Sequence, residues 1–221
     1  MREHILLTGM ILEAGPVNDY DRRLVVLTKE RGKVTIFARG ARRMNSKLTA
    51  ATAPFVFGEF KAYEGRNAYN LIDVDVQFYF EELRENIEGA YLGMYFLEYA
   101  AYYSRENNDE LELLKLLFQT IRAVVKGTID LRLIRAVYEI KILAVNGEFP
   151  GIPAGRSFLP ATEHTISFII RTPIEKLYTF TVSEAVLSEL SRLSDEYRKR
   201  FTDHSFKSLK ALETLPQGTR H

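Results

Sequence analysis

A dense run of basic residues between Arg22 and Lys47 offers the clearest chemistry in this chain. The run holds nine basic residues and one acid, Glu30, so its net charge is +8, whereas the whole chain of 221 residues carries +1. A balanced protein that concentrates positive charge in one segment usually presents it to an anionic partner. The segment therefore predicts phosphate binding, with a solvated basic face as the alternative. The basic residues are Arg22, Arg23, Lys29, Arg31, Lys33, Arg39, Arg42, Arg43 and Lys47.

The densest cluster lies where a strand-like segment gives way to a segment of helical composition. Arg39, Arg42, Arg43 and Lys47 gather there, and Phe37 lies next to this cluster. If residues 42–47 are helical, Arg43 and Lys47 share one face. Guanidinium forks fit phosphate oxygens and stack on bases, and aromatic rings accept bases. This combination favours single-stranded nucleic acid as the ligand.

Other basic residues are candidates through strand pairing or turn position. Arg22, Arg23 and Phe57 are expected to join the cluster through strand pairing, although only one of the two successive arginines should face the ligand. Weaker candidates are Lys29, Arg31, Lys33 and Arg66, of which the first three lie around a hairpin turn and are expected to steer the strand.

Catalytic and metal chemistry has little support. The chain has no cysteine, which excludes disulfides, cysteine-ligated zinc and thiol nucleophiles. Asp73 and Asp75 share one strand face and offer a cation site, although a solvated face is the simpler interpretation. We therefore predict that the chain is not an enzyme and that it needs no cofactor, metal or small-molecule substrate. The histidines lie far apart without ligand spacing: His4, His164, His204 and His221.

The segments that position these residues begin with a strand-rich region, residues 1–80. Five strand-like stretches are joined by turns rich in Gly, Asn and Asp, and a short helix is expected over residues 41–53, ended by Pro54. Five strands with a helix between the third and fourth is the layout of an OB-fold barrel. The stretches are residues 5–12, 24–27, 34–39, 55–63 and 72–76.

The remaining chain is predicted to be mostly helical. Residues 81–147 form a helical domain, within which Asp130 caps a helix. Residues 148–180 are rich in Pro and Gly and form an irregular insertion, with a short strand over residues 165–170. Residues 181–221 supply C-terminal helices that pack on the helical domain. The fold class is thus α+β: an N-terminal OB-fold barrel followed by an all-α domain with a small irregular C-terminal insertion.

The N-terminus and the hydropathy pattern point to a cytoplasmic protein. The opening segment lacks a signal-peptide cleavage site, and no run approaches the roughly 18 apolar residues that a membrane helix needs.

One long ordered segment, GMILEAGPVNDYDRRLVVLTKERGKVTIFARGARRMNSKL, resembles the start of the RecO family of bacterial recombination mediators. The similarity runs over about the first 150 residues and is thin afterwards. The resemblance implies a cytoplasmic, nucleoid-associated protein of DNA repair and recombination that binds single- and double-stranded DNA. It implies strand annealing and recombinase loading with RecR. It also implies contact with the acidic C-terminal tail of single-stranded-DNA-binding protein.

Two features qualify this resemblance. Many family members carry a four-cysteine zinc finger after the position of Gly147 to Pro150, which this cysteine-free chain cannot form. A basic patch for the acidic tail would have to come from Lys126, Arg132, Arg135 and Lys141, and surface charge for solubility is an equal alternative. Two other functions stay open: an OB-fold assembly module for RNA or protein, and a hydrolytic or metal-dependent enzyme.

Overall fold

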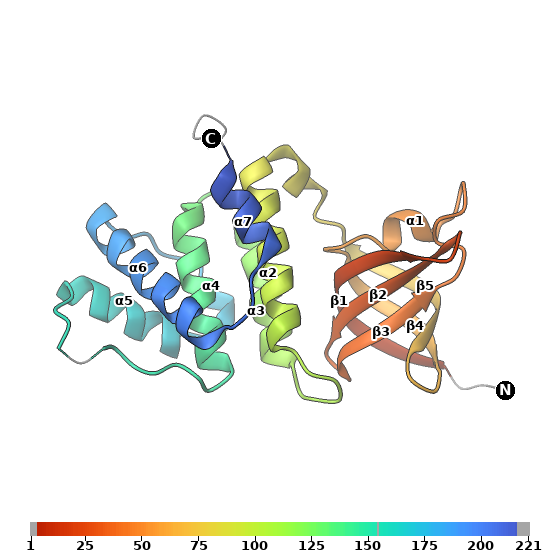
Figure 1. Ribbon diagram of the computed structural model, residues 1–221, viewed down its shortest axis with the longest axis horizontal. Coiled ribbons are helices and arrows are strands. Elements are labelled where there is room, and N and C mark those ends of the chain that lie inside the picture. The colour runs from red at the N-terminus through yellow and green to blue at the C-terminus, as the bar shows by residue number, and fades with distance from the viewer. Residues whose placement is uncertain (1–3, 154, 216–221) are drawn as a thin grey trace. The chain divides into compact units, whose positions relative to one another are not determined.

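The computed structural model describes residues 4–153 and 155–215, which fall into two compact units. The barrel unit consists of the chain up to Glu81 together with residues 97–114. The helical unit consists of residues 82–96 and the chain from residue 115 onward. Figure 1 labels the elements of both units.

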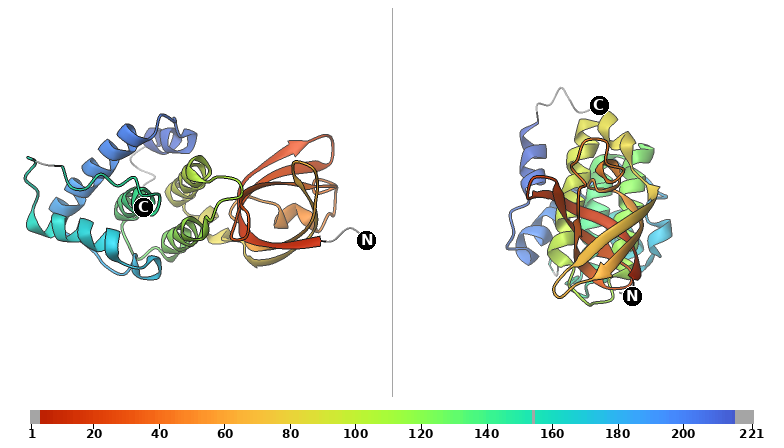
Figure 2. Two further views of the ribbon diagram at one scale, coloured as in Figure 1. Left: turned by 90° about the horizontal axis from the view of Figure 1, so that it is seen from below. Right: turned by 90° about the vertical axis from the view of Figure 1, so that its right-hand side faces the viewer.

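Five strands form a closed barrel in the order β1-β2-β3-β5-β4 (Figure 2). Neighbouring strands are antiparallel except β3 and β5, which pair in parallel. A short helix, α1 (Leu48–Ala51), separates β3 from β4 in the sequence. This layout confirms the predicted OB-fold barrel. The strands are β1 (His4–Val17), β2 (Asp21–Thr28), β3 (Gly32–Ala38), β4 (Phe57–Glu64) and β5 (Tyr69–Phe78).

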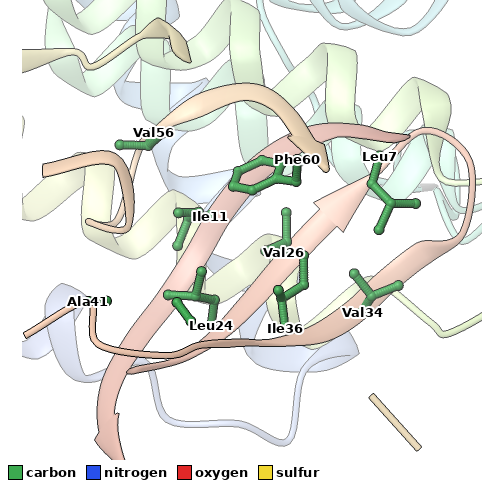
Figure 3. Close-up of a cluster of buried hydrophobic side chains, with 10 residues drawn as sticks. Leu7, Ile11, Leu24, Val26, Val34, Ile36, Ala41, Val56 and Phe60 are labelled. Atoms are coloured by element: carbon green, nitrogen blue, oxygen red, sulfur yellow. The ribbon is translucent and has the colours of Figure 1, made fainter. Parts of the chain in front are cut away.

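The barrel interior is filled by the apolar residues of the period-two pattern. On β3, Val34, Ile36 and Ala38 are buried, and the residues between them are half-exposed. A one-residue slip would turn this whole apolar row to the outside, so the pattern fixes the register. Side chains from four strands converge in the core (Figure 3), with Phe60 of β4 fully buried among them.

The chain after the barrel is helical, which confirms the α+β class. Its elements are η1 (Glu81–Glu85), α2 (Ile87–Tyr103), α3 (Leu111–Lys126), α4 (Leu131–Val145), α5 (Pro160–Arg171), η2 (Ile174–Lys176), α6 (Glu184–Phe201) and α7 (Lys207–Thr214). As predicted, Asp130 caps α4, because its carboxylate accepts a hydrogen bond from Arg132 N at 2.8 Å. Within the helical unit, α4 packs against both α5 and α6.

The strand expected over residues 165–170 is wrong, because this segment is part of helix α5. Pro160 occupies the first turn, where a proline suits a helix. Thr162, Thr165, Ile166 and Ile169 are buried at three- and four-residue spacing. The β-branched residues suggested a strand, but packing of this stripe against α4 and α6 outweighs their weak preference.

The connection between α2 and α3 is attached to the β2–β3 hairpin by main-chain hydrogen bonds. Lys33 N donates to Arg105 O at 2.9 Å, and Asn107 N donates to Arg31 O at 2.9 Å. Gly32 lies between the two bonds at φ +62°, and a Cβ atom there would lie 2.4 Å from Arg105 O. The hairpin therefore needs glycine at this position, both for its backbone conformation and for the close approach.

Candidate nucleic-acid interface

Three segments meet where β1 ends, β2 begins and β3 runs into α1. Arg42 N donates to Tyr20 O at 2.8 Å, and Gly40 N donates to the Asp21 carboxylate at 2.7 Å. The Arg43 guanidinium lies over the Tyr20 ring, 5.6 Å from its centroid. Main-chain bonds thus hold the loop of residues 39–43 against the β1–β2 turn, while its arginine side chains are exposed.

Arg23 and Phe37 extend this basic surface along the outside of the barrel. They are direct cross-strand partners on β2 and β3, so their side chains lie on the same face about 5 Å apart at Cβ. Arg23 is exposed and also donates to Thr35 Oγ1 at 3.5 Å. We call the set of Arg23, Arg39, Arg42, Arg43 and Lys47 the arginine end of the barrel. Within this set, Arg23 lies beside Phe37 and Arg43 lies over the ring of Tyr20.

Arg22 has a different environment from its neighbour Arg23. Its Nη1 donates to Thr49 O at 2.8 Å and to Thr52 Oγ1 at 2.9 Å, which ties α1 to β2. It also lines a cleft of about 240 Å³ together with Arg42. The two successive arginines therefore differ: Arg22 is bound to α1, whereas Arg23 is exposed on the outside of the barrel.

Phe57 does not join the arginine end by strand pairing. It lies on β4, where it faces Met10 of β1 and Phe78 of β5, and its ring lies 6.3 Å from that of Phe78. The barrel order places β4 between β1 and β5, so β4 does not border β2 or β3. This part of the strand-pairing prediction is wrong.

The basic residues of the hairpin lie at the other end of β3. That strand has seven residues, so its ends are roughly 20 Å apart at about 3.3 Å per residue. The ammonium group of Lys33 donates to Ala101 O at 2.7 Å, and burial lowers the pKa of this lysine. Lys29 and Arg31 are exposed. A run that is continuous in the sequence is therefore divided between two ends of the barrel.

The four candidates for an acidic partner lie at the end of α3 and along α4. Arg132 forms exposed ion pairs with Asp130 and Glu184, both at 2.7 Å, and these hydrogen bonds raise its pKa. Lys126 is exposed at the end of α3.

Arg135 belongs to a mostly buried ionic cluster between helices. It donates to Glu139 at 2.9 Å and to Asp195 at 3.3 Å. Burial opposes the charge of Arg135, but the Glu139 carboxylate raises its pKa above the ordinary value. The Tyr95 hydroxyl donates to the same carboxylate at 2.6 Å. These bonds connect α4 to α2 through Glu139 and Tyr95, and they connect α4 to α6 through Arg135 and Asp195.

Lys141 is buried and holds the C-terminal end of α5. Its ammonium group donates to Ile170 O at 2.8 Å and to Thr172 O at 2.9 Å. A cation suits the carbonyl groups at a helix C-terminus. Lys141 therefore helps to attach α5 to α4. Helix α5 lies within residues 148–180, the region in which the sequence has no cysteine to bind a metal.

The substitution Lys141→Met is expected to lower the free energy of unfolding by about 2 kcal/mol, because it leaves two partly buried carbonyl oxygens without their donor. Urea denaturation followed by circular dichroism measures this loss. Lys126→Met is the matched control, since it removes an exposed lysine from a helix end. Equal midpoints for the two variants would contradict the role assigned to Lys141.

The carboxylates considered for a cation site lie on the outside of the barrel. Asp73 and Asp75 are exposed on β5, opposite Lys61 and Glu59. Among residues 4–153 and 155–215, no group of three or more metal-ligating side chains occurs. His221 lies outside this range. Over the same range, every helix is too short or too polar to cross a bilayer.

Comparison with known proteins finds similarity to one family. The profile described as "Recombination protein O N terminal" matches residues 1–80, which include the arginine end. A protein of Acetivibrio thermocellus named "DNA repair protein RecO" is 22% identical over 96% of this chain and 97% of its own length. The chain is similar to the RecO family over nearly its whole length.

Other proteins with the same name show this similarity over different ranges. The RecO protein of Clostridium novyi is 22% identical over 95% of this chain and 94% of its own length. That of Alkaliphilus metalliredigens is 30% identical, over 64% of this chain and 58% of its own length. The similarity thus extends beyond the barrel into the helical part of the chain.

Tyr20 and Thr35 are parts of this surface that the sequence interpretation missed. Tyr20 lies in the β1–β2 turn, where 54% of it is exposed and its ring packs under Arg43. An aromatic residue in the turn that precedes a basic strand was the available signal. Thr35 carried no such signal, because its contact with Arg23 depends on the register of β2 and β3.

Proposed function

We propose that this chain is a non-catalytic DNA-binding protein of recombinational repair. It binds single- and double-stranded DNA at the arginine end, anneals complementary strands and helps to load recombinase together with RecR. We expect it to act in the cytoplasm, associated with the nucleoid. The observation that carries the proposal is the group of exposed arginines at one end of a barrel whose relatives are named for DNA repair, with Arg23 beside Phe37 and Arg43 over Tyr20.

The physical argument rests on two kinds of contact. Exposed guanidinium groups neutralise backbone phosphates, which supplies affinity without regard to sequence. A half-exposed ring such as Phe37 accepts an unpaired base, and stacking of this kind tolerates every base. Annealing needs this lack of sequence preference, because the protein must hold strands whose bases are still free to pair.

Annealing of two complementary fluorescent strands tests the proposal. The wild-type chain is expected to accelerate annealing, and a variant with Arg39, Arg42 and Arg43 all changed to Ala is expected to lose most of the acceleration. Unchanged annealing by this variant would place the DNA surface elsewhere. Competition with RNA of the same sequence provides a second readout, because preferential binding of RNA would indicate a reader of the 2′-hydroxyl group and an RNA module instead.

A cleavage assay distinguishes this function from that of an enzyme. The same DNA is incubated with divalent cations, and intact strands are expected throughout. Cation-dependent cleavage that disappears in Asp73→Asn and Asp75→Asn variants would contradict the non-catalytic assignment.

For the acidic tail of single-stranded-DNA-binding protein, we propose the helical unit. Arg132 and Arg135 line one cavity of about 480 Å³ together with Arg192, Leu92 and Leu212, and the carboxylates of Glu88, Asp195 and Glu213 line it as well. Basic and apolar side chains in one cavity suit a short peptide that is both acidic and apolar. Binding of a fluorescent tail peptide should weaken in an Arg192→Ala variant. Equal affinity of this variant and the wild type would remove the cavity from consideration.

A further inference from the structure

We propose that a groove at the hairpin end of the barrel is a second anchor for the same DNA strand, and that it selects single strands over duplexes. This inference rests on the proposed function. The groove lies between the β2–β3 hairpin, the β4–β5 turn and the α2–α3 connection, all within the barrel unit. Arg31 and Arg66 line it together with Tyr69 and Asn67.

The groove is continuous with the arginine end along the outside of β3. Thr35 lines the groove, and the same hydroxyl accepts a hydrogen bond from Arg23 of the arginine end. Phe37 follows two residues further along β3, on the same face as Thr35. A strand held at the arginine end can therefore pass over Phe37 and Thr35 into the groove.

The composition of the groove suits one nucleotide better than a long stretch of phosphates. Glu64 and Glu106 also line it, so its charge is nearly balanced. Lys33 already donates to Ala101 O, which leaves Arg31 and Arg66 as the cations available to a ligand. The volume of about 160 Å³ is well below the roughly 300 Å³ at which pockets for drug-sized ligands begin. A single base beside Tyr69, which is half-buried against the barrel core, fits this space, with its phosphate on an arginine.

The separation of the two anchors provides the selection for single strands. They lie at opposite ends of a seven-residue strand, roughly 20 Å apart at about 3.3 Å per residue. A flexible single strand can follow the curved outside of the barrel across this distance, whereas duplex DNA is stiff over about 150 base pairs. A duplex also has no free bases to offer to Phe37 or Tyr69. Duplex DNA is therefore expected to contact the arginine end alone.

The double substitution Arg31→Ala/Arg66→Ala tests this proposal in the full-length chain. Fluorescence anisotropy is measured with oligothymidylates of about 4 to about 16 nucleotides, the range of site sizes of single OB folds, and with a duplex. The variant is expected to bind the longest strands on the order of tenfold more weakly than the wild type, as for loss of one stacked nucleotide. Its affinities for the shortest strands and for the duplex should equal those of the wild type.

The matched control is Arg84→Ala/Lys176→Ala, which removes two exposed cations of the helical unit. A loss that is equal for short strands, long strands and duplex, or no loss at any length, would overturn the groove assignment. The triple variant of Arg39, Arg42 and Arg43 separates this outcome from failure of the proposed function. If the triple variant loses DNA binding while the groove variant does not, only the groove assignment fails; if neither loses it, the proposed DNA surface fails as well.

Discussion

Replacing Arg39, Arg42 and Arg43 together by alanine is expected to weaken binding of single-stranded DNA on the order of 100-fold at low salt. Each exposed guanidinium–phosphate contact is assigned about 1 kcal/mol, at the low end for charged hydrogen bonds because solvent screens it. Three such contacts correspond to roughly 100-fold in affinity. The main-chain bonds that hold this loop, such as that from Arg42 N to Tyr20 O, do not depend on the side chains.

A control variant shows whether the effect is specific to this surface. Lys176, Lys207 and Lys210 are three exposed cations of the helical unit, and changing them to alanine removes the same net charge. This control is expected to bind DNA nearly as well as the wild type. Equal losses in the two triple variants would mean that net charge, rather than the arginine end, determines affinity.

The substitution Glu139→Gln is expected to lower the free energy of unfolding by about 3 kcal/mol, the low end for breaking a buried ion pair. The side chain of Glu139 is 1% exposed and accepts hydrogen bonds from Tyr95 and Arg135. Arg198 lies 3.7 Å away and is also largely buried. Glutamine keeps the size of the side chain but removes the charge, so Arg135 and Arg198 lose the more deeply buried of the two carboxylates that they share. Urea denaturation measures the change.

The exposed pair of Glu184 with Arg132 is the matched comparison. Both side chains are more than half exposed, so Glu184→Gln should leave the urea midpoint almost unchanged. Similar midpoints for Glu139→Gln and Glu184→Gln would show that the cluster around Glu139 contributes no more than a surface pair.

The barrel was predictable because its apolar residues follow a strict local rule. Val34, Ile36 and Ala38 alternate with polar or larger residues, and this period alone identifies a half-buried strand. Helix α4 was similarly evident from the capping residue Asp130. Helix α5 was not evident, because the residues that precede it are rich in Pro and Gly. Its buried stripe packs against α4 and α6, and the sequence pattern does not show these partners.

The candidate site was predictable in composition but not in arrangement. Charge counting identified the Arg22–Lys47 run, yet it could not show that the hairpin places Arg31 and Lys33 at the opposite end of β3 from Arg39. It also could not show that Arg22 ties α1 to the barrel. These facts depend on contacts between residues distant in sequence, which a periodic pattern does not encode.

The α4 candidates illustrate the same limit. A basic residue on a helix was interpreted as a site for an acidic partner, because exposure is the usual state of arginine and lysine. Lys141 is instead buried against the end of α5, and Arg135 belongs to the cluster around Glu139. Only the packing of α4 between α5 and α6 reveals these roles.

The salt dependence of single-stranded DNA binding tests the central claim most directly. Five contacts at the arginine end predict a slope of roughly −3.5 in log affinity against log salt, at about −0.7 per phosphate contact. The triple variant of Arg39, Arg42 and Arg43 retains two contacts and should give a slope of roughly −1.4. A wild-type slope near zero, or equal slopes for the wild type and the triple variant, would contradict a DNA interface at the arginine end.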